Sequence, residues 1–127
     1  MRLSLVQKIL ALPFTLRQQR LAKYRPPMGE SEFVKQIGVK GGDEEAAILI
    51  RNYLLDWIYT DGFTPYPDDN LGHIYGIAEE ELDEDLILMI FRRVGVEPSR
   101  FEAIGQHWID ATPLQVALLI KQARVAT

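Results

Sequence analysis

The sequence predicts an all-α protein, and three observations lead to this fold class. Four segments repeat apolar residues at the spacing of a helix, and most are bounded by residues that start or stop helices. No segment shows sustained strand alternation, and FVKQIGV (33–39) is too short to form a sheet. The chain has 127 residues, 47% of them hydrophobic, which suits one compact domain with an extension.

The first predicted helix is amphipathic and covers RLSLVQKILAL (2–12). Ser4, Gln7 and Lys8 gather on one side of the helix, and large apolar side chains cover most of the other side. Pro13 is expected to end or kink this helix, because proline lacks an amide hydrogen and its ring clashes with the preceding turn.

A second basic stretch continues as helix over 15–25, and RPPMG (25–29) indicates a boundary between two regions. We expect a basic amphipathic N-terminal arm, residues 1–28, and a helical body, residues 29–127. The arm carries six basic residues and no acid, whereas the body carries eight basic and eighteen acidic residues, a net charge of −10. A basic arm can fold back on an acidic body, bind an anionic membrane or meet an acidic partner.

The first long helix of the body is expected to start at Asp43, which can cap it, and to end near Tyr59. Residues 60–78 are rich in glycine, proline and aspartate and predict a long loop. Three residues of this loop are expected to anchor it in the core: Leu71, Ile74 and Tyr75.

A second body helix is expected from about Ala78 to Arg93, with Gly95 as its stop signal. Its apolar half, LILMIF (86–91), is too wide for a single buried stripe. We therefore expect this helix to be covered on more than one side, with the N-terminal arm as one candidate cover.

The last predicted helix has a clear start, since Thr112 can cap it and Pro113 suits the first turn. Residues 96–109 separate it from the second body helix and are expected to form a loop with a short helix.

The start of the second body helix is strongly acidic, because six of the seven residues from Glu79 to Asp85 are aspartate or glutamate. The first three acids suit the helix dipole, but the others extend the charge beyond what capping needs. The run lacks the turning glycine and ligand spacing of a calcium loop, and its carboxylates have no signal of desolvation for acid–base catalysis. A solvated helix start and a docking surface for a basic partner both remain open. The candidate partner-binding residues are Glu79, Glu80, Glu81, Asp83 and Glu84.

Few residues offer other chemistry. The chain has no cysteine, which excludes disulfides, zinc thiolates and thiol catalysis. His73 and His107 are interpreted as packing or surface residues, and the sequence contains no nucleophile elbow or P-loop. We therefore expect no enzyme activity, no cofactor and no metal, and the acidic body disfavours nucleic acid.

The sequence also bears on location. No stretch approaches the roughly 20 apolar residues that cross a bilayer, and the N-terminal residues lack the pattern of a secretory signal. We expect a cytoplasmic protein, with peripheral membrane contact through residues 2–25 as an alternative.

The order of the predicted elements resembles that of an acyl carrier protein. PDDNLGHIYGI (67–77) leads into the acidic helix, and DATPLQVALLI (110–120) opens the last helix. The resemblance covers about residues 43–124 and implies an antiparallel helical bundle to which the N-terminal amphipathic helix is added. Residues in comparable places are Asp68, Asp69, Leu71, Gly72, Leu82 and Thr112.

One departure from the family concerns the cofactor. Carrier proteins attach phosphopantetheine to a serine at the start of the second helix, but this chain has no serine from Glu32 to Pro98. Tyr75 or Glu81 falls at the attachment position, depending on the direction of counting, and neither can carry the cofactor. The chain is most similar to bacterial acyl-carrier-like proteins that lack this serine.

The resemblance implies that basic partner enzymes recognise the acidic second helix. We therefore expect a non-catalytic, carrier-like interaction module that binds a basic protein surface through Glu79, Glu80, Glu81, Asp83 and Glu84. The alternative is a peripheral membrane protein that uses the basic amphipathic arm, and a homodimer through the arm is also open.

Overall fold

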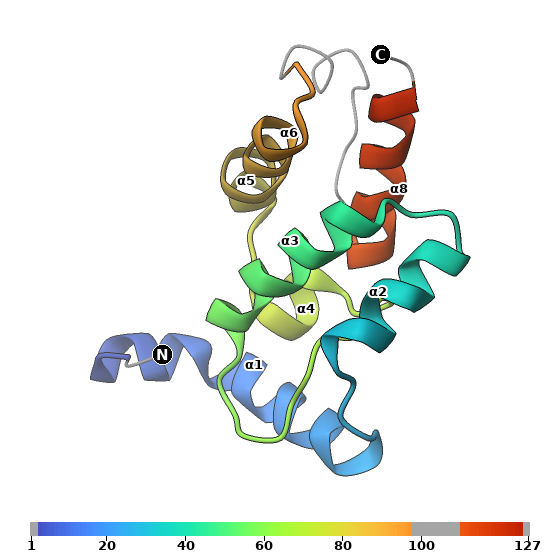
Figure 1. Cartoon of the computed structure of the whole chain (residues 1–127). Coiled ribbons are helices and arrows are strands. Elements are labelled where there is room, and N and C mark those ends of the chain that lie inside the picture. The colour runs from blue at the N-terminus through green and yellow to red at the C-terminus, as the bar shows by residue number, and fades with distance from the viewer. Residues whose placement is uncertain (1–2, 98–109, 126–127) are drawn as a thin grey trace.

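The computed structural model describes residues 3–97 and 110–125, and every regular element in these two ranges is helical, which confirms the all-α prediction. The expected loop and short helix at 96–109 lie almost wholly outside the described residues. Helices α5, η2 and α6 follow one another without a break (Figure 1). The elements are α1 (Leu5–Tyr24), α2 (Glu30–Val39), α3 (Glu44–Leu54), the 3₁₀ turn η1 (Leu55–Trp57), α4 (Leu71–Tyr75), α5 (Glu79–Glu81), the π-helical η2 (Leu82–Ile87), α6 (Leu88–Val94) and α8 (Pro113–Val125).

Local sequence signals set several helix ends as predicted. The carboxylate of Asp43 caps α3 and accepts a hydrogen bond from the amide of Ala46 at 2.8 Å. Thr112 caps α8, because its hydroxyl accepts from the amide of Gln115 while the Gln115 side chain accepts from the amide of Thr112. Gly95 ends α6 with a φ of 77°, which glycine adopts without steric cost.

Two helices were not predicted from the sequence. Helix α2 forms where no element was assigned, and it buries Phe33 and Ile37, one turn apart, against the core. Helix α4 lies inside the predicted loop and holds the expected anchors: Leu71 and Tyr75 are fully buried and Ile74 is half-buried. Both helices are short, so their stability comes from tertiary packing rather than from intrinsic propensity.

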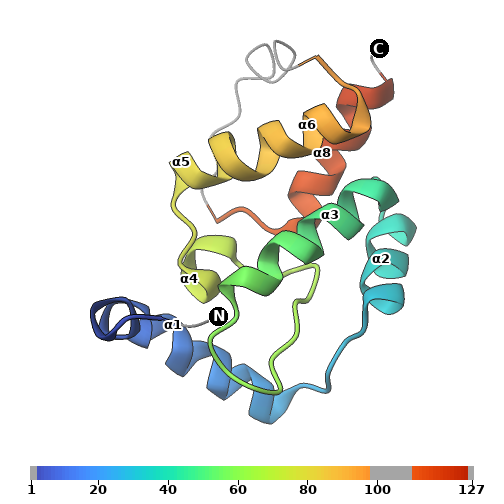
Figure 2. The ribbon, with the colours of Figure 1, turned by 60° about the vertical axis from the view of Figure 1, so that its left-hand side comes forward.

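Helix α3 lies at the centre of the described structure and contacts α2, α6 and α8 (Figures 1 and 2). It is shorter than predicted, because it ends at Leu54 and continues only as the 3₁₀ turn η1. On the facing helix, Leu86 and Ile90 are fully buried, and so are Ile87 and Phe91 on its flank. The helix is therefore covered on more than one side, as its wide apolar face predicted.

The N-terminal arm does not provide this cover. Both views place α4 between α1 and the continuous helix α5–η2–α6 (Figures 1 and 2). Helix α1 itself runs unbroken from Leu5 to Tyr24 with Pro13 inside it, and it changes direction along its length. The kink predicted from Pro13 is consistent with this bend, whereas a helix end at Pro13 is excluded.

Candidate functional surfaces

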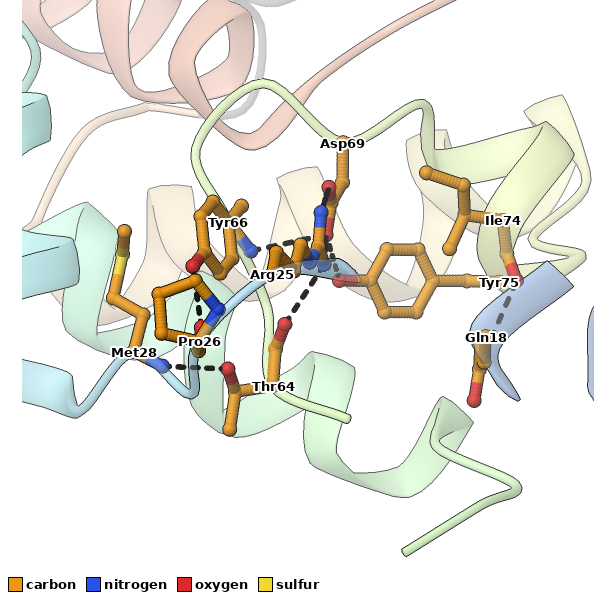
Figure 3. Close-up of polar contacts among 9 residues, drawn as sticks. All are labelled: Gln18, Arg25, Pro26, Met28, Thr64, Tyr66, Asp69, Ile74 and Tyr75. Carbon is orange, nitrogen blue, oxygen red and sulfur yellow. Dashed lines mark hydrogen bonds and ion pairs between the residues drawn. The ribbon is translucent and has the colours of Figure 1, made fainter. Parts of the chain in front are cut away.

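Helix α1 is held on the body by a buried amide side chain. Gln18 is 0% exposed. Its Nε2 donates a hydrogen bond to the carbonyl oxygen of Ile74 at 3.2 Å (Figure 3). The same Nε2 donates to the carbonyl oxygen of Trp57 at 2.9 Å, and Oε1 accepts from the amide of Tyr59 at 2.8 Å. Because all three partners belong to the body, Gln18 fixes which side of α1 faces inward.

The inward side of α1 carries Ala11 and Gln18, with Phe14 and Leu21 partly buried, whereas the other large apolar side chains in its first half point outward. Ala11 and Gln18 are the buried residues of this helix. Six exposed apolar residues of α1, from 51% exposed at Leu12 to 75% at Leu5, form a surface that we call the outward stripe. Exposed apolar groups gathered in this way are typical of an interaction surface. The outward stripe consists of Leu5, Val6, Ile9, Leu10, Leu12 and Leu16.

The charged residues of α1 are all basic, with Lys8 near its start and Arg17, Arg20 and Lys23 in its second half. Arg20 and Lys23 lie four and seven residues beyond Leu16, so they continue the face of the outward stripe toward the end of the helix. Lys8 flanks the stripe, and Arg17 donates a hydrogen bond to the carbonyl oxygen of His73 at 2.8 Å. No acidic residue occurs between residues 3 and 29, so no carboxylate in α1 offsets these charges.

The junction between arm and body contains a dense polar cluster around Arg25. Its guanidinium donates to both carboxylate oxygens of Asp69, at 2.7 and 2.9 Å, and to the carbonyl oxygen of Thr64 at 2.9 Å (Figure 3). It also lies over the ring of Tyr66, 3.9 Å from the centroid. Arg25 also lies over the ring of Phe63, and the hydroxyl of Tyr75 donates to Asp69 at 2.7 Å, so three aromatic residues contact this ion pair.

The two neighbouring acids of the loop before α4, Asp68 and Asp69, have different roles. Asp69 is 3% exposed and accepts from Arg25, from the Tyr75 hydroxyl and from the amide of Tyr66. Burial and the neighbouring Asp69 carboxylate raise the pKa of Tyr75 well above its ordinary value. Asp68, by contrast, is exposed and pairs with Lys40 at 3.4 Å. Asp69 is therefore a structural residue, whereas Asp68 is available to solvent.

The structure divides the predicted partner-binding residues by exposure. Glu79, Glu80 and Glu84 are exposed, whereas Glu81 and Asp83 are half-buried. The carboxylate of Glu81 accepts a hydrogen bond from the amide of Ala78, which begins the helix. The acidic run therefore contributes both to the helix start and to a charged surface.

Asp85 is exposed too, although it was not among the predicted partner-binding residues, and it brings negative charge close to Tyr53 on α3. Burial, followed by the carboxylates of Asp85, Glu81 and Asp56, raises the pKa of Tyr53 to about 12. The Tyr53 hydroxyl is buried without a hydrogen-bond partner among the described residues, while its ring lies 6.1 Å from that of Trp57. Carboxylates and aromatic rings thus share one region of the surface.

The predicted absence of a metal site stays a prediction. Within residues 3–97 and 110–125, no three histidine, aspartate or glutamate side chains are grouped so that they could hold a metal ion. His73 is exposed, and its carbonyl oxygen is engaged by Arg17. His107 lies outside the described residues.

Sequence reasoning did not settle two features of these surfaces. Nothing in the pattern distinguishes Gln18 from its exposed neighbour Gln19, because burial of the Gln18 side chain depends on the Trp57 carbonyl and the Tyr59 amide, about forty residues away. The direction in which the apolar side of α1 faces was left open by the sequence. Ala11 was the available signal: it is small and lies seven residues before Gln18, on the same face of the helix, where a core-facing apolar side would carry a large residue.

No family model matches the chain, and neither a curated protein nor a solved structure matches it. The likeness to acyl carrier proteins therefore stays a prediction. Among the described residues, no helix has the length and apolar character required to cross a bilayer.

Proposed function

We propose that this protein binds peripherally to anionic membrane surfaces through α1. The observation that supports this function is the outward stripe: its six apolar side chains are more than half exposed, on a helix whose opposite side is fixed to the body by Gln18. Removing a leucine or isoleucine side chain from water is worth roughly 1.5–3 kcal/mol. A surface that covers the stripe therefore has a large driving force.

The dimensions and charge of α1 suit the interface of a bilayer. Leu5, Ile9, Leu12 and Leu16 recur at helical spacing over roughly 17 Å, at 1.5 Å per residue. Such a helix lies in the plane of the interface with its apolar face among the acyl chains and its basic residues near the headgroups. Arg20 and Lys23 extend the same face and supply the electrostatic attraction that a short apolar stripe needs for stable binding.

The charge of α1 favours an anionic membrane over a second copy of the chain. Two copies that joined their outward stripes in parallel would bring Arg20 and Lys23 of both copies close together, with no acid between residues 3 and 29 to pair with them. An anionic lipid surface supplies the opposite charge. Salt should therefore weaken binding to vesicles, because it screens exposed charges.

Flotation with phosphatidylcholine–phosphatidylglycerol vesicles tests this function. The wild-type chain should float with the vesicles, and the double variant Ile9→Gln/Leu12→Gln should remain at the bottom of the gradient. A matched control is Val39→Gln/Val125→Gln, which removes two apolar side chains that are exposed elsewhere. Equal flotation of both double variants would contradict the proposal. If the wild-type chain instead forms a concentration-dependent dimer and the Ile9/Leu12 variant does not, the stripe serves self-association.

A second candidate function is the docking of a basic protein partner to the acidic helix. Its support is the exposure of Glu80, Glu84 and Asp85 on the part of the molecule that α4 separates from α1 (Figure 2). The two functions use different surfaces, so each can be tested without the other. Charge reversal at Glu80 and Glu84 should reduce partner capture in pull-downs and its salt sensitivity, while reversal at Glu30 and Glu32 on α2 should not. Unchanged capture and salt sensitivity in the first variant would exclude the acidic surface.

The acyl-carrier-like interpretation of the body is part of this second proposal. Its support is the order of α3, a long loop, the acid-started helix and a threonine-capped last helix. The missing serine removes the attachment point for phosphopantetheine, so the proposed role is recognition without thioester chemistry. Mass spectrometry after co-expression with a phosphopantetheinyl transferase should show an unmodified chain.

A further inference from the structure

A hollow between α1 and the segment after α3 is lined by aromatic side chains that are not part of the outward stripe. It has a volume of about 390 Å³ and lies beside Phe14, Trp57 and Tyr59, with Leu10 and Asp56 also on its walls. We call it the aromatic hollow. Leu10 also belongs to the outward stripe, so the hollow opens at the flank of the surface that we propose to lie on a membrane.

The aromatic walls of this hollow are fixed in place. Gln18 binds the carbonyl oxygen of Trp57 and the amide of Tyr59, so both backbone positions are held relative to α1. The ring of Phe14 packs against Gly76, where an added Cβ atom would lie only 2.7 Å from the ring. A site whose walls are already ordered loses little entropy when a ligand binds.

The charged residue on the walls of the hollow is the acid Asp56. Asp56 is exposed and forms no ion pair within the described residues, and Glu81 acts on Tyr59, whose pKa burial and this carboxylate both raise. The cation Arg17 lies 5.5 Å from the centroid of the Phe14 ring, and its bond to the carbonyl oxygen of His73 holds it toward α4. Aromatic faces combined with carboxylates attract organic cations.

The type of cation follows from the hydrogen-bonding groups available. A primary ammonium has three N–H donors to satisfy, whereas the walls of the hollow are mostly apolar and aromatic, with Asp56 as their charged residue. A quaternary ammonium has no N–H groups to satisfy, and its methyl groups pack well on aromatic faces. We infer that the aromatic hollow binds a quaternary ammonium group, presented by the choline headgroup of a phospholipid.

This inference rests on the proposed membrane function for the source of its ligand, but its chemistry can be tested without a membrane. Titration of the full-length chain with choline, followed by broadening of the choline methyl resonance in NMR spectra, measures binding of the soluble group. The neutral tert-butyl analogue of choline has the same shape without the charge. We expect choline to bind at least about fivefold more tightly than this analogue. Equal affinity, or no binding of choline, would overturn the inference.

Two variants place the site. Asp56→Asn should weaken choline binding about fivefold, whereas Asp61→Asn, which removes a nearby exposed acid, should leave it unchanged. Trp57→Leu should weaken binding by a similar factor, and circular dichroism shows whether that variant is folded. If Asp56→Asn and Asp61→Asn behave alike, the hollow is not the site.

Vesicles distinguish the lipid from a soluble source. At a fixed fraction of phosphatidylglycerol, phosphatidylcholine vesicles should bind the wild-type chain more tightly than phosphatidylethanolamine vesicles, and Asp56→Asn should remove the difference. No preference between the vesicles would overturn the lipid as the source of the ligand. If the wild-type chain binds choline but binds neither kind of vesicle, the membrane function is refuted and the choline site is not.

Discussion

Arg25 and Asp69 form a two-bonded ion pair that connects the end of α1 to the loop before α4, 44 residues further along the chain. Asp69 is 3% exposed and the Arg25 side chain 18%, so water screens the pair poorly. The stacking of Arg25 on Tyr66 and its bond to the carbonyl oxygen of Thr64 add to the same contact. This pair makes the position of α1 dependent on the loop before α4.

Loss of the Asp69 carboxylate should destabilise the fold strongly. Asp69→Ala leaves Arg25 and the Tyr75 hydroxyl without their partner in a largely buried place, which should lower the free energy of unfolding by about 3 kcal/mol. Urea denaturation followed by circular dichroism measures this change. The control is Asp68→Ala, which removes only an exposed pair with Lys40 and should cost less than about 1 kcal/mol. Similar losses in both variants would contradict the structural role of Asp69.

The buried amide of Gln18 should be required for docking of α1. Gln18→Leu has a similar shape but leaves the carbonyl oxygens of Trp57 and Ile74 and the amide of Tyr59 unsatisfied, a cost of about 2–4 kcal/mol. Hydrogen exchange should accelerate at the amide of Tyr59. The neighbouring exposed residue offers the control, since Gln19→Leu should change neither stability nor this exchange rate.

Gly76 should be sensitive to substitution for two separate reasons. Its φ of 80° strains any residue with a Cβ atom, and that atom would lie 2.7 Å from the ring of Phe14. Gly62 has the same φ but no neighbouring atom within 4 Å of the added Cβ. Gly62→Ala should therefore cost about 1 kcal/mol from backbone strain alone. Gly76→Ala should cost clearly more in denaturation experiments, and equal costs would show that Phe14 moves away freely.

Tyr53 should ionise at unusually high pH. Its pKa is raised from 10.0 to about 12 by burial and by nearby carboxylates, so the folded state favours the neutral phenol. The stability that this group contributes is fully present below pH 10 and is lost as the pH rises through about 12. Tyr53→Phe should have little effect at neutral pH, because the hydroxyl has no partner among the described residues.

Ultraviolet titration of tyrosinate absorbance tests this shift. The difference between wild type and Tyr53→Phe should report one tyrosine with a midpoint near pH 12. The free energy of unfolding should also fall less steeply with pH in the variant between pH 10 and 12. A midpoint near pH 10 for this residue would show that its hydroxyl is hydrated.

The parts of the fold that the sequence predicted are those that depend on neighbours in the chain. Asp43 and Thr112 cap helices within three residues of their own positions, and Gly95 ends a helix through its own backbone. Helix α2 was missed because only two of its positions, Phe33 and Ile37, are buried, and their fit depends on α3.

The candidate surfaces divide in the same way. Exposure of Glu80 and Glu84 follows from their place at the start of an amphipathic helix, so the acidic surface could be predicted. The outward stripe could not, because amphipathic sequence predicts that one side of α1 is apolar without saying which side the body binds. That choice is made by Gln18 through carbonyl and amide groups that are remote in sequence.

Because α4 lies between α1 and the acidic helix (Figure 1), the basic and acidic residues of these helices are kept apart. Basic residues gather on α1 and acidic residues on α5 and η2. The separated charges give the molecule an electric dipole moment. Near a negatively charged membrane surface, the electric field exerts a torque on this dipole. The torque turns α1 toward the membrane before any contact is made. The orientation of first encounter is thus set at a distance, and the acidic end is left pointing back into the solution.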